Sequence, residues 1–305
     1  MSGEIQFVEK IRRLAAVPAG SRLVLGIGDD CAIFRPRGAL EDLLFTTDML
    51  LEDAHFRRGD HPPFALGRKA LARGLSDIAA MGGEPRFCLL SLALPDWTDE
   101  RWADRFLKGL LRLARETATP LAGGDLARAE RFSCDIVVCG AVPRGTALRR
   151  DGARPGDRIY VSGRLGGSAL GLATRSGAPW KRHLLPEPRL ALGRFLRETV
   201  RASAAMDLSD GLSLDLRRLC LASQVSAAID PPPLFPGASL DQGLHGGEDY
   251  ELLFTAPPRT RVPSRFRNVP LTCIGLIGAG KPGTVTLAGQ PLAPSGFDHL
   301  ARRGS

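Results

Sequence analysis

Residues 26–34 read GIGDDCAIF, and this segment places two carboxylates, Asp29 and Asp30, in a glycine turn between apolar runs. The preceding residues, Val24–Ile27, predict a strand that ends at the turn. Gly28 would let the backbone approach an anion closely. Carboxylates among apolar neighbours are costly unless they are hydrogen-bonded or paired with a cation. The segment therefore predicts a strand-based fold whose turns carry an acidic site.

The same arrangement recurs along the chain, where predicted strands or helices meet polar or glycine-rich turns. The further acidic motifs are TTD (46–48), LSDIAAMGG (75–83), AGGD (122–125), MDLSDG (206–211) and HGGEDYE (245–251). Several carboxylates brought together repel one another, and their pKa values rise unless cations join them. Magnesium prefers hard oxygen ligands and bridges phosphates, so the set predicts a magnesium site. Each motif alone also fits a turn or helix cap, most plausibly at Asp29 and Asp249.

Strand and helix patterns alternate along the whole chain, which predicts an α/β (α+β) fold with two halves. A break at DGARPGD (151–157) predicts the boundary, with an N-terminal domain over 1–148 and a C-terminal domain over 149–305. Helices are expected over 64–81, 99–117, 166–173 and 212–223. Strands are expected over 24–27, 43–47, 88–94, 133–142, 158–162, 227–230 and 250–255.

Composition narrows the class of protein. The 305 residues carry a net charge of +8, but the arginines are dispersed and aromatics make up only 6%, so no nucleic-acid partner is expected. The six cysteines include no C-x-x-C pair, which fits a reducing cytoplasm. The first residues lack the pattern of a signal peptide, and no apolar run approaches the length of a membrane span, so no membrane partner is expected.

Two other motifs leave alternatives open. The turn GRLGGS (163–168) could cradle a phosphate or begin a helix after a strand, and His55 could contact a ligand or lie on the surface. Cys31 is expected to be a packed thiol, because adjacent carboxylates disfavour a thiolate. The chain contains neither a P-loop motif nor the protein-kinase motif set, so phosphate would be bound mainly through metals.

Taken together, these motifs resemble the thiamine-monophosphate kinase family, whose wider superfamily includes aminoimidazole ribonucleotide synthetase. The matching segments occur in family order over nearly the whole chain: GIGDDCAIF, TTDML with His55 downstream, LSDIAAMGGEP, LAGGD, LRRDGARPGD, MDLSDGLSLDL, HGGEDYELLFT and GFDHL. The resemblance implies a homodimer of two-domain chains in which the N-terminal sheet domain binds metal and ATP and makes the dimer contact. It also implies transfer of phosphate from ATP to thiamine monophosphate, giving thiamine diphosphate.

The resemblance assigns roles by matched position. It implies several magnesium ions held by Asp30, Thr46, Thr47, Asp48, Asp77, Asp125, Asp207 and Asp210. It implies ATP contacts from Gly124, Asp125, Arg150 and Ser209, and acceptor contacts from His55, Glu248 and Phe297. The segment Pro231–Gly243 carries no family information. Three other functions remain open: a related ATP-using enzyme, a nucleotide or metal sensor, and a basic nucleic-acid-binding module.

Overall fold

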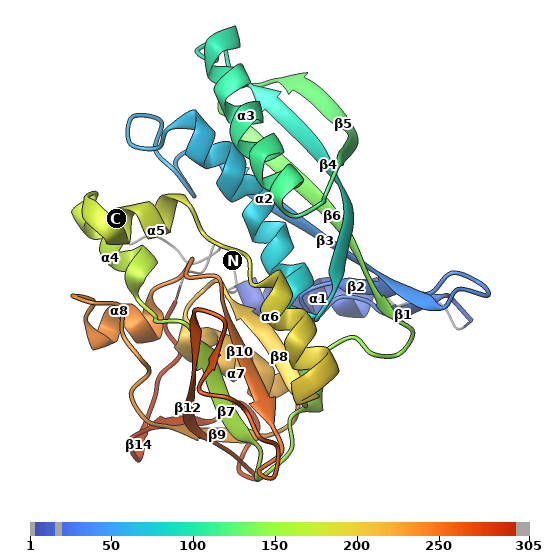
Figure 1. The fold of residues 1–305 in the computed structure, drawn as a ribbon, viewed down its shortest axis with the longest axis vertical. Coiled ribbons are helices and arrows are strands. Elements are labelled where there is room, and N and C mark those ends of the chain that lie inside the picture. The colour runs from blue at the N-terminus through green and yellow to red at the C-terminus, as the bar shows by residue number, and fades with distance from the viewer. Residues whose placement is uncertain (1–3, 16–19, 297–305) are drawn as a thin grey trace.

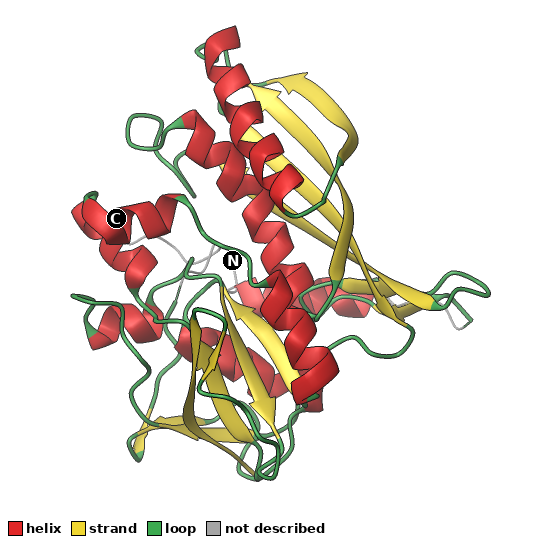
Figure 2. Cartoon of the chain, viewed as in Figure 1, coloured by secondary structure: helices red, strands yellow, loops and turns green. Residues whose placement is uncertain are grey.

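The computed structural model of the chain describes residues 4–15 and 20–296, which form two β-sheets with helices packed against them (Figures 1 and 2). The first sheet contains the strands up to residue 143, and the second begins at residue 158. Phe297, one of the expected acceptor contacts, lies outside the described residues. No helix in the described part of the chain combines the length and apolarity needed to cross a membrane.

The first sheet has six strands in the order β1-β2-β3-β6-β4-β5. Only β4 and β5 run parallel, and the other neighbours are antiparallel. The strands are β1 (Leu23–Leu25), β2 (Ala32–Phe34), β3 (Glu41–Leu51), β4 (Glu84–Leu94), β5 (Leu121–Arg128) and β6 (Ser133–Pro143).

Helices α2 (Pro63–Ala80) and α3 (Glu100–Glu116) pack beside this sheet, and α2 lies between it and the second half of the chain (Figure 1). The two helices approach closely at two glycines. A Cβ on Gly67 would lie 1.9 Å from the Phe106 carbonyl oxygen, and one on Gly109 would lie 1.9 Å from the Phe64 carbonyl oxygen. This close contact fixes α2, and α2 carries part of the site described below.

The second sheet runs in the order β14-β13-β9-β12-β7-β10-β8, with β11 paired to β12. Its β13–β9 pair is parallel and its other pairs are antiparallel. The strands are β7 (Arg158–Ser162), β8 (Ala204–Leu208), β9 (Ser226–Ile229), β10 (Glu251–Ala256), β11 (Arg265–Phe266), β12 (Val269–Gly278), β13 (Val285–Leu287) and β14 (Gln290–Pro291).

Shorter helices surround the second sheet, and one precedes the first. They are α1 (Glu4–Leu14), α4 (Gly167–Thr174), α5 (Gly177–Leu184), α6 (Leu190–Phe195) with its π-helical continuation (Leu196–Val200), α7 (Leu212–Ala222) and α8 (Leu240–His245), besides a 3₁₀ turn at Arg150–Gly152. Each sheet has its own buried apolar cluster, and a third cluster joins the end of α2 to α6, β8 and β10.

The fold class predicted from the sequence is confirmed, and the long elements lie close to their expected positions. Two expectations about local structure are wrong. The strand does not end at Asp48, because β3 continues to Leu51. Gly123, Gly124 and Asp125 do not form a turn but continue strand β5. Glycine is tolerated there because β5 approaches β4 closely. A Cβ on Gly124 would lie 1.8 Å from the Leu90 carbonyl oxygen.

Candidate active site

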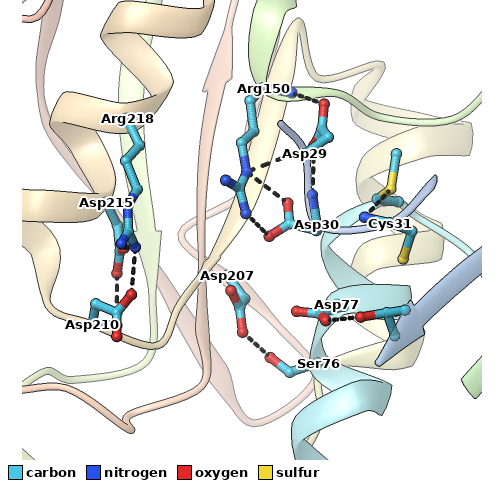
Figure 3. A network of polar contacts seen from close by, with 12 residues as sticks. Asp29, Asp30, Cys31, Ser76, Asp77, Arg150, Asp207, Asp210, Asp215 and Arg218 are labelled. Carbon is cyan, nitrogen blue, oxygen red and sulfur yellow. Dashed lines mark hydrogen bonds and ion pairs between the residues drawn. The ribbon is translucent and has the colours of Figure 1, made fainter. Parts of the chain in front are cut away.

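Three carboxylates from distant parts of the chain meet between the two halves. Asp30 lies in the turn after β1, Asp77 in the last turn of α2, and Asp207 on β8. One oxygen from each lies within 4.8 Å of the other two. Figure 3 shows the three side chains facing a common space. The sequence predicted this convergence from the glycine-rich acidic turns, and the structure brings these three residues together.

The electrostatics of the cluster favour a bound cation. Burial, reinforced by repulsion from the neighbouring carboxylates, raises the pKa values of Asp77 and Asp207 well above the ordinary range. A divalent ion would remove both the repulsion and the cost of burying unpaired charge. The donors are all hard oxygens, so the residues fit magnesium.

Polar neighbours orient the three carboxylates. The Ser76 hydroxyl on α2 donates to Asp207 at 2.7 Å, and the Thr46 hydroxyl on β3 donates to Asp77. Arg150 donates from Nε to Asp30 at 3.3 Å (Figure 3). Because Ser76 and Asp207 belong to opposite halves, the cluster is fixed only when the halves are packed together.

Three of the other expected metal ligands are bonded to other groups. Asp48 accepts a hydrogen bond from Arg73 at 3.3 Å, and the Thr47 hydroxyl donates to Asp135 at 2.6 Å. Asp210 forms an ion pair with Arg218, which also reaches Asp215 (Figure 3). Asp48 and Asp210 still line the cavity that contains Asp77 and Asp207.

Asp125 does not join the cluster. Together with Gly124 it lies on β5, where residues 122–128 are exposed. Neither residue lines the cavity beside the carboxylates. The structure therefore leaves Asp125 on an open strand of the first sheet, outside the group of three carboxylates.

The two carboxylates expected to act as caps or turn residues do so. Asp29 accepts hydrogen bonds from the backbone amides of Asp30 and Arg150, at 2.9 and 3.1 Å. Asp249 accepts from the amides of Gly166 and Ser168 at the start of α4. The 163–168 turn is therefore a helix start whose amides are bonded to a carboxylate, and its interpretation as a phosphate cradle is wrong. The Cys31 thiol is buried, as expected.

A cavity of about 570 Å³ extends from the carboxylates toward α4 and α5. Its lining includes three residues expected to contact ligands: Ser209, His55 and Glu248. The backbone amide of Leu51 donates to His55 Nδ1 at 3.0 Å. The Glu248 backbone has a φ of 64°. Such a conformation is uncommon for a non-glycine residue, and it is held here by a 2.7 Å bond from the Glu248 amide to the Ser209 carbonyl.

Glu248 belongs to a buried charged network at the far end of the cavity. It forms an ion pair with Lys69 at 2.8 Å and approaches His183 at 3.5 Å. Burial alone would raise the pKa of Glu248, but Lys69 and His183 lower it to about 2. Burial and the nearby Lys69 lower the pKa of His183 to about 3. His183 in turn lies 3.1 Å from His61, and its ring stacks on Trp180.

Sequence reasoning missed Lys69, Arg73, Ser76 and His183 as members of the site. A signal for the first two was present: Lys69, Arg73 and Asp77 are spaced four residues apart in an otherwise largely apolar helix. Side chains at this spacing share one face of a helix. No comparable local pattern marks His183.

Comparisons with known proteins agree with this geometry. Residues 28–144 match the family model of the AIR synthase related protein, N-terminal domain. The chain is 41% identical to the thiamine-monophosphate kinase of Escherichia coli (strain K12), over 91% of this chain and 92% of that protein. A solved structure of AaThiL complexed with AMPPCP and TMP superposes with a TM-score of 0.85, at 31% identity over 98% of this chain and 97% of that chain. The thiamine-monophosphate kinase of Stenotrophomonas maltophilia K279a gives a TM-score of 0.77 at 36% identity, over 94% of this chain and 96% of that chain.

Proposed function

Since this chain belongs to the thiamine-monophosphate kinase family, we propose that it transfers the γ-phosphoryl group of ATP to the phosphate of thiamine monophosphate. An oxygen of the acceptor phosphate forms the new bond to the γ-phosphorus, and the bond to the β-phosphate oxygen breaks. Thiamine diphosphate and ADP are the products. The observation that carries the proposal is the convergence of Asp30, Asp77 and Asp207, of which Asp77 and Asp207 line a ligand-sized cavity.

The chemistry requires charge neutralisation more than a strong base. A phosphate monoester has a second pKa of about 6, so the acceptor is largely ionised at neutral pH. Two unit charges 4 Å apart repel by about 4 kcal/mol at an effective dielectric constant of 20. Asp30, Asp77 and Asp207 would hold magnesium, which neutralises and bridges phosphate oxygens when bound.

The remaining expected contacts are assigned to the two substrates. Arg150, beside Asp30, is proposed to contact ATP together with Ser209. Glu248 and His55, which line the cavity, are proposed to contact the acceptor, together with Phe297. Asp48 and Asp210 line the cavity and are proposed as further metal ligands. Thr46, which donates to Asp77, and Thr47, the next residue of β3, are proposed to complete the set.

We further propose that the functional units are residues 1–148 and 149–305, and that the protein is a cytoplasmic homodimer. The open side of the first sheet supports pairing through that sheet. Strand β5 is exposed there, and it includes Leu126, which is 72% exposed. Pairing would cover Gly124 and Asp125 and could bring them to a nucleotide. Cysteines without disulfides fit a reducing compartment.

A coupled assay of ADP release tests the proposed function. The reaction is run with thiamine monophosphate or free thiamine as acceptor, with magnesium or with excess chelator. We expect release only with thiamine monophosphate and magnesium. Phosphorylation of thiamine alone would refute the acceptor assignment, and ATP binding without ADP formation from either acceptor would favour a sensor.

A further inference from the structure

The cavity side of α2 carries three charged residues in a row. Lys69, Arg73 and Asp77 are each four residues apart and therefore share one face of the helix. Asp77 belongs to the carboxylate cluster, and Lys69 is paired with Glu248. Arg73 lies between them, so it occupies the middle of the route from the proposed metal site to the proposed acceptor site.

The guanidinium of Arg73 is only partly satisfied by protein. Its side chain is 12% exposed and lines the cavity, and one nitrogen donates to Asp48 at 3.3 Å. Its Nε and Nη1 atoms are enclosed, and neither has a hydrogen-bond partner among the residues that the structure describes. Buried donors without partners are costly, so their presence at a cavity wall points to a ligand that accepts these hydrogen bonds.

The chemistry of the group identifies the kind of ligand. A guanidinium presents a planar fork of donors that matches the oxygens of a phosphate. The other arginine of the cluster, Arg150, interacts with Asp29, Asp30 and Asp207, whereas Arg73 interacts with Tyr250, Asp48, Glu248 and Asp77. The two arginines therefore flank the carboxylates on different sides, and Arg73 lies on the side of Glu248.

We propose that Arg73 binds the phosphate of the acceptor and makes the site select a phosphorylated acceptor over the corresponding alcohol. Asp48 accepts from one nitrogen of the guanidinium, and Nε and Nη1 remain as donors for the ligand. This inference rests on the proposed function, and it adds a specificity-determining residue to it. Free thiamine lacks the phosphate, so it would gain nothing from Arg73.

Calorimetric titration of thiamine monophosphate and of free thiamine into the full chain tests the inference. In the wild type we expect thiamine monophosphate to bind more tightly. In Arg73→Gln its Kd should rise roughly 10- to 100-fold, the effect of losing one or two charge-assisted hydrogen bonds, while the Kd of thiamine stays unchanged. Arg73→Lys keeps the positive charge but lacks the planar fork of donors, so its Kd for thiamine monophosphate should lie between those of the wild type and Arg73→Gln.

Arg68→Gln is the matched control. Arg68 lies on the same helix but is bonded to Glu116 of α3, at 2.6 Å, so its loss should leave both affinities unchanged. Any of three results would overturn the inference. Arg73→Gln could keep the full preference for thiamine monophosphate, Arg73→Gln could weaken the binding of both ligands equally, or the wild type could show no preference. Wild-type turnover measured in parallel separates the two claims, because absence of ADP release with thiamine monophosphate contradicts the proposed function itself.

Discussion

Asp207 illustrates how a single residue can lower stability and serve function. Its carboxylate is buried beside Asp30 and Asp77, and burial with this repulsion raises its pKa. We expect Asp207→Asn to abolish turnover while the free energy of unfolding in chelator stays equal or rises, because a buried charge is removed and the amide can still accept from Ser76. Urea unfolding and ADP release measure the two effects.

The control for this substitution is Asp241→Asn, which changes an exposed carboxylate in the first turn of α8. It should alter neither turnover nor stability appreciably. Wild-type turnover in folded Asp207→Asn would remove Asp207 from the mechanism.

His183 makes a specific contribution to the pH dependence of stability. Burial and Lys69 lower its pKa from 6.5 to about 3, so the native imidazole stays neutral where the unfolded one takes up a proton. The free energy of unfolding therefore falls as pH drops from 6.5 toward 3, by up to about 1.4 kcal/mol per pH unit from this group. His183→Gln should remove that contribution.

Urea unfolding of both proteins at pH 6.5, 5.5 and 4.5 checks this expectation. The difference between wild type and His183→Gln isolates the histidine from other titrating groups, such as Asp77 and Asp207, whose raised pKa values act in the opposite direction. A difference that does not vary with pH would show that the imidazole has the same pKa in the native and unfolded states, which contradicts the lowered pKa.

At the residue scale, the sequence identified carboxylates whose neighbouring residues indicate a site. Asp30, Asp77 and Asp207 belong to short motifs that contain glycine or small residues, GIGDDC, LSDIAAMGG and MDLSDG, so the motifs were visible. Lys69 and Arg73 were not identified, because a charged residue within a helix is ordinarily solvent-exposed. Only the packing of α2 between two halves of the chain makes these positions interior, and that packing depends on contacts distant in sequence.

At the scale of elements, long amphipathic helices were predicted well because their apolar period is read over many residues. Strand β5 was not, because the pair Gly123-Gly124 has the composition of a turn. Its strand state comes from pairing with β4, where Gly124 avoids a clash with the Leu90 carbonyl. Short elements such as β2 and α6 have too few residues to show a period.

The contact between α2 and α3 offers a test at this scale. A methyl group on Gly109 would lie 1.9 Å from the Phe64 carbonyl oxygen and push the helices apart. We expect Gly109→Ala to lower the free energy of unfolding by about 1–3 kcal/mol, the usual range for overpacking. Thermal and urea unfolding measure the loss.

Gly59→Ala is the control for that experiment, since an added Cβ there meets nothing within 4 Å. It should leave stability within about 0.5 kcal/mol of the wild type, as expected for a surface change. Equal stability of the two variants would mean that α2 and α3 are not in tight contact.

At the scale of the whole molecule, the site exists only because the two halves are packed together. Lys69 of α2 pairs with Glu248 across this boundary at 2.8 Å, and the lysine is buried. Removing one partner of a buried pair typically costs about 3–5 kcal/mol, because the other charge is left uncompensated. Lys69→Met and Glu248→Gln should each lower the free energy of unfolding strongly. The double variant should lose less free energy of unfolding than the sum of the two single losses.

A double-mutant cycle from urea unfolding gives the coupling energy, which we expect to exceed about 1 kcal/mol. The matched cycle uses Arg194 and Glu84, a pair that crosses the same boundary at 3.0 Å on the exposed surface. Its coupling should stay below about 1 kcal/mol because solvent screens it. Additive effects at Lys69 and Glu248 would mean that the pair does not join the halves.

The most direct test of the account counts divalent ions at the carboxylate cluster. Electron paramagnetic resonance measures free Mn²⁺, used as a magnesium substitute, as protein with a non-hydrolysable ATP analogue is added. We predict that the wild type depletes the free signal below the level set by the analogue alone, and that the Asp77→Asn/Asp207→Asn double variant, still folded, does not. Equal depletion by both proteins, or none by the wild type, would contradict a metal site formed by these side chains.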